Sequence, residues 1–278
     1  MTSRIFLPDL LRGQVCVVSG AGTGLGRAAA IELAGLGAAV VVCGRRKQLL
    51  DEVVALLGDD AEAHSVDIRD EAAVDAMFDT IVARHGRIDF LLNNAGGQFM
   101  APAETVNGKG FRTVLELNAL GTWQMSRAAA TKAMIPQKSG KIVNVTLSPH
   151  NGFPGLFHAG AARAAVENMT RALSVEWARY GVKVSAIAAG HFDTEVLHSK
   201  YPDVVGRTAA TWPPLGRLGT VDEFAWLVAY LASPAGDYFT GGVITIDGAR
   251  DNWYGPWPPP GLYDGEVSPT ERRREKSS

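Results

Sequence analysis

Four glycines lie at the junction between a short apolar run and a stretch with helical periodicity near the N-terminus. The apolar run Val15–Val18 leads into Ser19-Gly20-Ala21-Gly22-Thr23-Gly24-Leu25-Gly26, and Arg27 then opens a run of alanines. Glycine lets such a turn fold tightly and lets the backbone approach a pyrophosphate. The helix that follows offers free N–H groups and the positive end of its dipole. The pattern predicts a dinucleotide site whose phosphates are held by Gly20, Thr23, Gly24, Leu25 and Gly26.

Two adjacent arginines follow the second apolar run and bear on the choice of dinucleotide. A site that prefers NAD(H) carries an acidic residue near this point, which accepts a hydrogen bond from the ribose 2′-hydroxyl group. Here the sequence is Val42-Cys43-Gly44-Arg45-Arg46, with no acid. Forked, charge-assisted hydrogen bonds from Arg45 and Arg46 suit a 2′-phosphate; the alternative is that both belong to a solvated helix start. NADP(H) is the cofactor that we expect.

The elements that must position these residues alternate along the chain. The candidate strands are Val15–Val18, Ala38–Cys43, Ala63–Val66, Ile88–Leu92, Lys141–Val145, Lys183–Ile187 and Val243–Ile246. The amphipathic segments between them include Arg27–Leu36, Glu71–Arg84, Phe111–Ile135, Ala161–Arg179 and Val221–Leu231. Strands that are apolar throughout and separated by helices form parallel sheets covered on both faces. We therefore expect an α/β protein of the Rossmann type, a doubly wound sheet of about seven parallel strands with helices on both faces.

Two segments interrupt this alternation. Residues 191–220 are rich in Pro, Gly and aromatic residues and follow a strand, where such folds place a lid or a binding loop. Residues 251–278 begin with several Trp, Tyr and Pro residues and end in a polar stretch. We expect one dinucleotide-binding catalytic domain over residues 1–250, which includes a substrate loop at 191–220. We expect the extension 251–278 to pack partly on the body or on a neighbouring subunit, through Trp253–Trp257, and to end in a disordered tail.

The composition argues against several classes of function. The formal net charge of −2 provides no basic surface for a nucleic acid, and no run approaches the roughly 18 apolar residues of a membrane span. The six histidines are scattered without the spacing of a metal site. Cys16 and Cys43 lie inside apolar runs, as buried free thiols do, and the N-terminus lacks the features of a secretion signal. We expect a reduced, metal-free cytoplasmic protein that acts on a small molecule.

Further motifs extend the pattern, and together they resemble the short-chain dehydrogenase/reductase family. They are Gly20-x-x-x-Gly24-x-Gly26, Asp67 after the third strand, Asn93-Asn94-Ala95-Gly96 after the fourth, Asn118 in the long fourth helix, and Gly190 and Thr194 after the sixth strand. The resemblance covers residues 12–250. It implies that Asp67 and Ile68 line the adenine, and that Asn94, Ala95 and Gly96 stabilise the central strand and touch the cofactor. It also implies that Thr194 meets the nicotinamide amide, with Gly190 beside it.

The catalytic centre departs from the family pattern. Members of the family carry a serine and then a Tyr-x-x-x-Lys motif, in which the tyrosine protonates the substrate oxygen and the lysine holds the nicotinamide ribose. The register of Ala164-Ala165-Val166 places Ala159 at the tyrosine position and Arg163 at the lysine position. The serine position falls near Leu147, with Ser148 next to it. The resemblance thus assigns Arg163 to the ribose and leaves the proton donor unassigned.

The missing acid bears on which reaction the site can run. Exchange between an alcohol and a ketone needs a proton at oxygen in step with hydride transfer. Arg163 can replace the positive charge of the lysine but, with a pKa above about 12, it offers no mobile proton. Reduction of a carbon–carbon double bond conjugated to a thioester has less need of a proton donor at oxygen. The negative charge spreads into an enolate, which fixed hydrogen-bond donors can stabilise. We expect Asn118, Ser148 or a bound water to be those donors. His158, next to the vacant position, is a candidate acid.

A more detailed resemblance points to the same chemistry. The segments His158-Ala159-Gly160-Ala161-Ala162-Arg163, Gly152-Phe153-Pro154 and Asn94-Ala95-Gly96-Gly97-Gln98-Phe99 are similar to those of the peroxisomal trans-2-enoyl-CoA reductases. The related 2,4-dienoyl-CoA reductases also displace or lack the usual tyrosine, and both groups reduce acyl-CoA double bonds with NADPH. A tyrosine assigned as the acid in the enoyl-CoA reductases would fall at Glu167, so that role does not carry over. The final Lys276-Ser277-Ser278 is not a peroxisomal address.

Three functions remain open from the sequence. The first, which we favour, is an NADPH-dependent reductase that acts on the conjugated double bond of an enoyl-CoA-like substrate. The second is a carbonyl reductase or alcohol dehydrogenase with a rearranged centre that uses His158 or Ser148. The third is a catalytically silent NADP-binding scaffold. Two helical segments, Phe111–Ile135 and Ala161–Arg179, are apolar around much of their circumference. Family members pair through these segments. We therefore predict a homotetramer, with a dimer as the alternative.

Overall fold

A seven-stranded sheet forms the centre of the molecule. The computed structural model describes residues 3–201, 205, 208–253 and 255. The strands are β1 (Val15–Ser19), β2 (Ala39–Gly44), β3 (Glu62–Ser65), β4 (Phe90–Asn93), β5 (Gly140–Leu147), β6 (Val182–Ala189) and β7 (Val243–Ile246). They lie in the order β3-β2-β1-β4-β5-β6-β7, and every neighbouring pair is parallel. The predicted doubly wound parallel sheet is confirmed.

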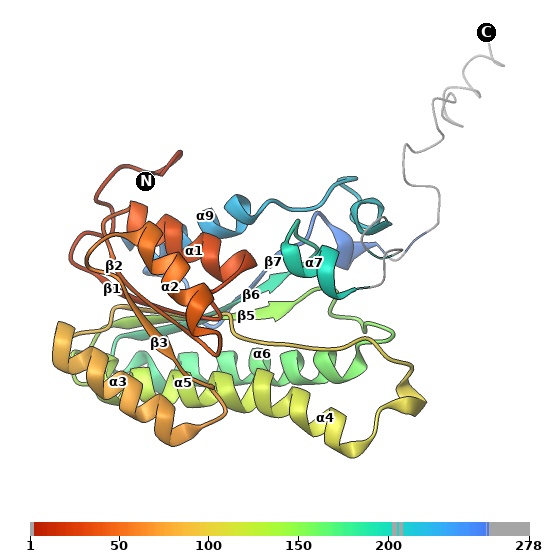
Figure 1. The fold of residues 1–278 in the computed structure, drawn as a ribbon, viewed down its shortest axis with the longest axis horizontal. Helices are drawn as coiled ribbons and strands as arrows, with labels where there is room; N and C mark the ends of the chain where they lie inside the picture. The colour runs from red at the N-terminus through yellow and green to blue at the C-terminus, as the bar shows by residue number, and fades with distance from the viewer. Residues whose placement is uncertain (1–2, 202–204, 206–207, 254, 256–278) are drawn as a thin grey trace, which may run out of the picture.

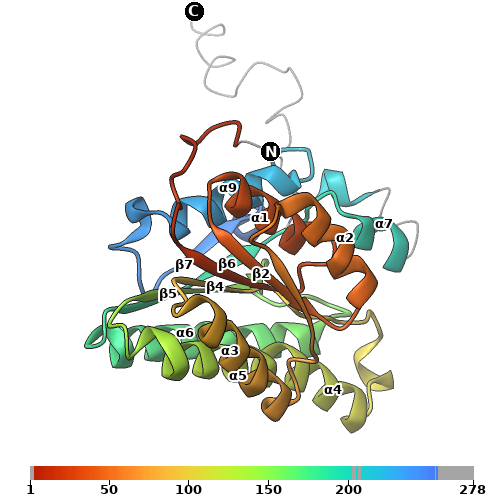
Figure 2. The ribbon, with the colours of Figure 1, turned by 60° about the vertical axis from the view of Figure 1, so that its left-hand side comes forward.

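Helices cover both faces of this sheet (Figures 1 and 2). One layer contains α1 (Gly24–Gly35), α2 (Lys47–Leu57) and α9 (Val221–Ala232). The other contains α3 (Glu71–His85), α4 (Gly108–Leu115), α5 (Gly121–Ala129) and α6 (Phe157–Ala178). Side chains alternate along each strand, so Cys16 and Val18 pack with the first layer while Val17 and Val41 pack with the second. Burial on both faces explains why these strands are apolar throughout.

The long helical segment predicted at Phe111–Ile135 is not a uniform α-helix. Between α4 and α5 lies the π-helical stretch η2 (Glu116–Leu120), and a second one, η3 (Ala130–Met134), follows α5. Each π-helical stretch shifts the register of the helix, and such stretches are frequent at functional sites. Asn118 lies within η2 and is fully buried. Sequence periodicity gave no sign of either interruption.

The segment 191–220 follows β6 and lies at the carboxyl edge of the sheet. It contains the short helix α7 (Glu195–Lys200) and the 3-10 turn η4 (Ala209–Thr211). Its ends are held together by a β-bridge between Phe192 and Gly219. Residues 251–253 continue the described chain beyond β7 as the end of a 3-10 turn, η6 (Arg250–Asn252), and Trp253. Most of the Trp253–Trp257 segment and the polar tail lie outside the described residues.

The strand order reverses between β1 and β4, which is where doubly wound folds bind their ligands. β1 pairs with β2 on one side and with β4 on the other, so the loops after β1 and β4 leave the sheet side by side. In parallel sheets a crevice opens at the carboxyl ends of the strands at this point.

Among the described residues, no helix is both long and apolar enough to cross a bilayer.

Candidate active site

A cavity of about 650 Å³ opens at the carboxyl ends of β1, β2, β4, β5 and β6. Most of the sequence-predicted cofactor residues line it. They are Gly20, Thr23, Gly24, Leu25, Arg45, Arg46, Asp67, Ile68, Asn94, Ala95, Gly96, Arg163, Gly190 and Thr194. Gly26 does not line the cavity. Of the predicted catalytic residues, Ser148 and Arg163 line it, whereas Asn118 and His158 do not.

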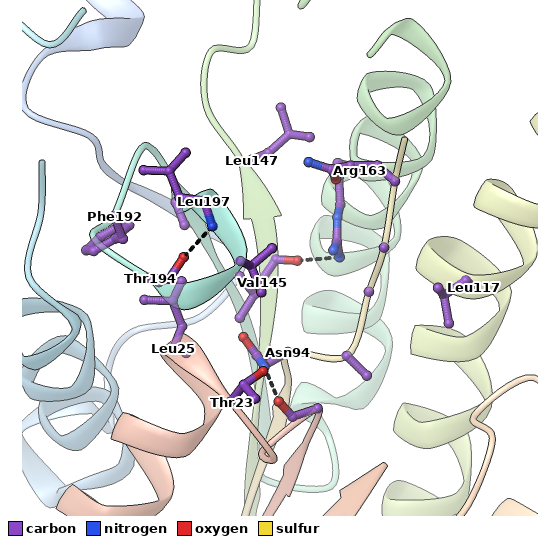
Figure 3. Close-up of a pocket in the computed structure, with 18 of the residues that line it drawn as sticks. Thr23, Leu25, Asn94, Leu117, Val145, Leu147, Arg163, Phe192, Thr194 and Leu197 are labelled. Carbon is purple, nitrogen blue, oxygen red and sulfur yellow. Dashed lines mark hydrogen bonds between the residues drawn. The ribbon is translucent and has the colours of Figure 1, made fainter. Parts of the chain in front are cut away.

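The glycines after β1 permit close contact between the first turn and the loop after β4. Gly20 has φ +66°, and a Cβ atom there would lie 2.8 Å from the Cα atom of Ala95. A Cβ atom on Gly26 would lie 2.5 Å from the carbonyl oxygen of Gly20. The side chain of Asn94 occupies this junction and donates hydrogen bonds to the carbonyl oxygens of Ser19 (3.2 Å) and Gly20 (3.1 Å) (Figure 3). Gly26 therefore acts through packing behind the cavity wall.

The N-terminus of α1 is open toward the cavity. Thr23 is the N-cap residue, yet its side chain makes no capping hydrogen bond, and the first turn contains no acidic residue. Its hydroxyl oxygen instead accepts a 3.4 Å hydrogen bond from Arg46. Free N–H groups and the helix dipole at this position favour an anion such as a pyrophosphate.

Arg45 and Arg46 are exposed where β2 ends, at the rim of the same cavity. Asp67 lies across from them, after β3, and accepts a forked hydrogen bond from Arg69 at 2.5 and 3.0 Å. The hydrogen bond to Arg69 is the main reason why the pKa of Asp67 is lowered, and the charge of Arg45 adds to that effect. The rim thus holds two cations that no side-chain carboxylate pairs with among the described residues.

Arg163 reaches the cavity from the second turn of α6 (Figure 3). Its Nη1 donates a 2.7 Å hydrogen bond to the carbonyl oxygen of Val145 on β5. Burial lowers the pKa of Arg163 to about 10, so the guanidinium stays charged at neutral pH. No described carboxylate forms an ion pair with it. A buried cation in a cavity wall without a carboxylate partner fits a polar ligand beside it.

Asn118 supports the wall from behind. Its amide nitrogen donates to the carbonyl oxygens of Gly97 and Val114, both at 2.8 Å. Its amide oxygen accepts a 3.2 Å hydrogen bond from the backbone N–H of Gly97. These bonds use both amide hydrogens, so the structure places Asn118 as an anchor for the loop after β4. The bonds also explain why an asparagine is tolerated in the middle of a helix.

Ser148 lies at the end of β5 and is nearly completely buried. Its hydroxyl group donates a hydrogen bond to Asp247, which follows β7. The backbone is crowded here, because a Cβ atom on Gly190 would lie 2.6 Å from the Cα atom of Asp247. Close approach of the loops after β6 and β7 is thus the structural reason for glycine at position 190.

His158 and Ala159 are both fully buried, and neither lines the cavity. Ala159 packs with Val114 and Leu156 in a small apolar cluster. The ring of His158 lies 4.5 Å from that of Phe99. Burial lowers the pKa of His158. The ring therefore packs behind Phe99, which itself lines the cavity.

Two further histidines, which no sequence motif marked, are prominent in the structure. His191 lines the cavity directly after Gly190. His150 bridges two carboxylates outside the cavity: Nε2 lies 2.9 Å from Glu167, and Nδ1 bonds Asp251. Burial acts to lower the pKa of His150, but its two acidic neighbours outweigh burial and raise that pKa. Asp251 is 101 positions away along the chain, so no local pattern predicts this contact.

The remaining cavity wall is largely apolar. It lies beyond the predicted nicotinamide end and receives side chains from the loop after β4, from η2, from the segment between β5 and α6, and from residues 191–220. These side chains include Phe99, Met100, Leu117, Phe153, Leu156, Val196, Leu197 and Trp212. An apolar wall of this kind suits the hydrocarbon part of a small-molecule substrate.

Comparison with known proteins agrees with this geometry. The family model described as "Enoyl-(Acyl carrier protein) reductase" matches residues 20–249. A probable 2,4-dienoyl-CoA reductase of Bacillus subtilis is 35% identical over 249 residues, which cover 87% of this chain and 97% of the relative.

Two solved structures have the same fold. A citronellol catabolism dehydrogenase of Pseudomonas aeruginosa PAO1 matches with a TM-score of 0.80 at 38% identity, over 89% of this chain and 98% of that one. A short chain dehydrogenase of Bacillus anthracis matches with a TM-score of 0.82 at 32% identity, over 89% and 100% of the two chains. The chain therefore belongs to the short-chain dehydrogenase/reductase family of oxidoreductases, which bind a nicotinamide cofactor.

Proposed function

We propose that this protein is an NADPH-dependent reductase that acts on the conjugated carbon–carbon double bond of an enoyl thioester such as an enoyl-CoA. The observation that carries the proposal is the pair Ala159 and Arg163. Arg163 brings a fixed positive charge into the cavity, whereas Ala159 is a methyl group buried behind the wall at the place of the usual proton donor. The printed name of the Bacillus subtilis relative is consistent with this substrate class.

The residues present fit the cofactor. The uncapped N-terminus of α1 would hold its pyrophosphate, and the exposed pair Arg45 and Arg46 would hold a 2′-phosphate. Asp67 and Ile68 would flank the adenine, and Arg163 would bond the nicotinamide ribose. Asn94, Ala95, Gly96, Gly190 and Thr194 would line the remainder. When bound, the cofactor supplies a hydride.

The chain's own residues would then position the substrate and hold charge. Hydride addition at Cβ sends negative charge to the thioester oxygen, and hydrogen-bond donors near that oxygen lower the barrier. Arg163 contributes a positive charge that does not depend on pH near neutrality, because its pKa is about 10. Asn118 acts as a positioning residue, since its amide holds Gly97 on the wall. Water would supply the proton at Cα.

Reduction of a carbonyl group is the second candidate. One observation favours it: Ser148, the hydroxyl-bearing residue next to the family's serine position, lines the cavity and hydrogen-bonds Asp247. One solved relative also bears the name citronellol catabolism dehydrogenase. A carbonyl substrate would require this pair to deliver a proton to oxygen.

The two candidates are separated by matched substrates. We would measure kcat/KM with NADPH for crotonyl-CoA and for acetoacetyl-CoA, which have the same carbon number and carrier. We expect a clear preference for crotonyl-CoA. Preference for acetoacetyl-CoA would instead support carbonyl reduction. Tight NADPH binding without turnover of either compound, or of a panel of simple ketones and enals, would identify a nucleotide-binding scaffold.

We also propose that the protein is a cytoplasmic homotetramer whose catalytic unit spans residues 1–250. Cys16 and Cys43 are free and fully buried, which is compatible with a reducing compartment. Apolar side chains on the helical layers remain exposed, among them Leu120 at 44% and Val175 at 78%. A contiguous apolar surface marks a subunit interface, and we infer that these helical layers provide one. Light scattering that gives the mass of one chain at micromolar concentration would contradict the tetramer.

A further inference from the structure

His191 lies in the wall of the cavity, held by two aromatic rings. It follows Gly190 directly at the end of β6. Its ring makes edge contacts with Trp212, at a centroid distance of 4.8 Å, and with Phe153, at 5.9 Å. Both aromatic residues also line the cavity. The imidazole is therefore fixed in orientation by rings on two other segments of the chain.

The two ring nitrogens of His191 differ in their surroundings. Nδ1 is buried and has no hydrogen-bond partner among the described residues. Nε2 is not among the buried atoms without a partner, and the residue lines the cavity, so we assign Nε2 to the cavity side. An N–H at Nε2 would be available to a ligand, and only a lone pair would remain buried at Nδ1.

The donors that the sequence predicts here already have partners inside the protein. The hydroxyl hydrogen of Ser148 is donated to Asp247. Nη1 of Arg163 is bonded to Val145, and the amide hydrogens of Asn118 are bonded to Gly97 and Val114. Arg163 retains further N–H groups, but these carry a positive charge and would bond the nicotinamide ribose. His191 therefore offers a neutral N–H group that is fixed in the wall beside the proposed substrate site.

We propose that His191 is a catalytic residue whose neutral imidazole donates a hydrogen bond from Nε2 to the thioester oxygen of the enoyl substrate. The inference rests on the proposed reduction of an enoyl thioester. The hydride forms a C–H bond at Cβ, the electron pair of the double bond moves through Cα and the carbonyl carbon, and negative charge arrives at the oxygen. NADPH is oxidised and the alkene is reduced. His191 keeps its proton, and water protonates Cα.

The surroundings favour the neutral form of His191. Its pKa is lowered to about 4, mainly by burial; the charge of Arg250 acts in the same direction, and the charge of Asp247 opposes them. The imidazole is therefore uncharged from about pH 5 upward, as one pH unit above the pKa leaves about a tenth protonated. A neutral donor in an apolar wall contributes more than the same donor in water, because little solvent competes for the acceptor.

Two variants separate the donor from the ring. His191→Phe keeps an aromatic ring between Phe153 and Trp212 but removes the N–H group. His191→Gln loses the ring contact but keeps a neutral donor. We expect His191→Phe to lower kcat for crotonyl-CoA by about 100-fold, the usual effect of losing one such donor, with KM and the Kd of NADPH nearly unchanged. We expect His191→Gln to recover at least about a tenth of kcat. His198→Phe, on the exposed surface of α7, is the matched control.

Several outcomes would overturn the inference. Full kcat in His191→Phe would exclude the donor, and equal loss in His191→Phe and His191→Gln would show that only ring packing matters. NMR of the nitrogen-15-labelled histidine rings adds a readout independent of turnover. With NADP⁺ present, butyryl-CoA should shift the Nε2 resonance of His191 and leave that of His198 in place. If the protein reduces no enoyl-CoA, the proposed function fails, and an unchanged His191 resonance would then remove this inference as well.

Discussion

The guanidinium group of Arg163 lies directly against Gly96, so that a Cβ atom at position 96 would overlap Nη2 and lie 2.7 Å from Oδ1 of Asn118. We predict that Gly96→Ala displaces Arg163 from the cavity wall. NADPH binding and turnover should both fall by about tenfold or more, the cost of a lost charged hydrogen bond. Isothermal titration and steady-state kinetics would measure the two losses. Gly108→Ala, at a position with open space for a methyl group, is the control.

Arg163 should tolerate loss of its forked N–H donors better than loss of its positive charge. We predict that Arg163→Lys keeps part of the activity, because an ammonium group can still reach the ribose, whereas Arg163→Ala removes most activity and weakens NADPH binding. The alanine variant also leaves the carbonyl oxygen of Val145 without its 2.7 Å donor. The measurements are kcat and the Kd of NADPH. Wild-type turnover and affinity in Arg163→Ala would show that the register drawn through Ala164-Ala165-Val166 is wrong.

Arg45 and Arg46 should determine the preference for NADPH over NADH. Replacing both by alanine is expected to weaken NADPH binding by roughly 1.5–3 kcal/mol, the range for hydrogen bonds to charged groups. NADH binding should hardly change, because it lacks the 2′-phosphate. Fluorescence titration of both cofactors gives the comparison, and Lys47→Ala, whose side chain pairs with Asp51 on the surface, controls for general loss of charge. Equal weakening of both cofactors would contradict the assignment.

Most of the residues that the sequence assigns to the cofactor line one cavity, whereas the contacts of His191 were not predicted, and the difference has a physical reason. The glycine turn after β1, Arg45 and Asp67 lie at fixed positions after successive strands, so the alternation of elements is enough to bring them together. His191 is held by Phe153 and Trp212, which lie 38 positions before it and 21 after it. Such contacts depend on the path of an irregular segment, and no periodicity encodes that path.

The assignments of His158 and Asn118 illustrate the same limit. Their types and positions in the sequence are compatible with catalysis, yet in the structure both side chains lie behind the wall. A helix turns by about 100° per residue, so His158 can adjoin a motif position and still pack elsewhere. Asn118 lies in a π-helical stretch, where the direction of a side chain does not follow from α-helical spacing.

His150 should make the stability of the fold depend on pH. Its pKa is raised in the folded state by Asp251 and Glu167, against about 6.5 in the unfolded chain. Its protonation therefore contributes stability that is fully present below about pH 6.5 and lost as the pH rises through the folded pKa. We predict that the difference in Tm between wild type and His150→Gln shrinks as the pH is raised from 5.5 to 9. A constant difference across that range would contradict the prediction.

Position 159 offers a direct test of why this centre lacks a proton donor. Ala159 is fully buried against Val114 and Leu156, so Ala159→Tyr must force a large ring into a packed cluster. We expect a loss of stability of about 1–3 kcal/mol, the usual cost of overpacking, and little gain in reduction of acetoacetyl-CoA. Leu156 belongs to the same cluster and also lines the cavity. Removing that side chain should open a path for the phenol group.

The double variant Ala159→Tyr with Leu156→Ala should therefore gain carbonyl reduction that neither single variant has. The tyrosine ring would fill the space left by Leu156 and bring a hydroxyl group toward the substrate oxygen, where a ketone needs its proton. Arg163 carries a positive charge nearby, which favours the ionised phenol and so helps proton release. The measurement is kcat/KM for acetoacetyl-CoA and crotonyl-CoA in all four proteins, together with their Tm values. If Ala159→Tyr alone is stable and active on the ketone, Ala159 does not lie behind the wall as described.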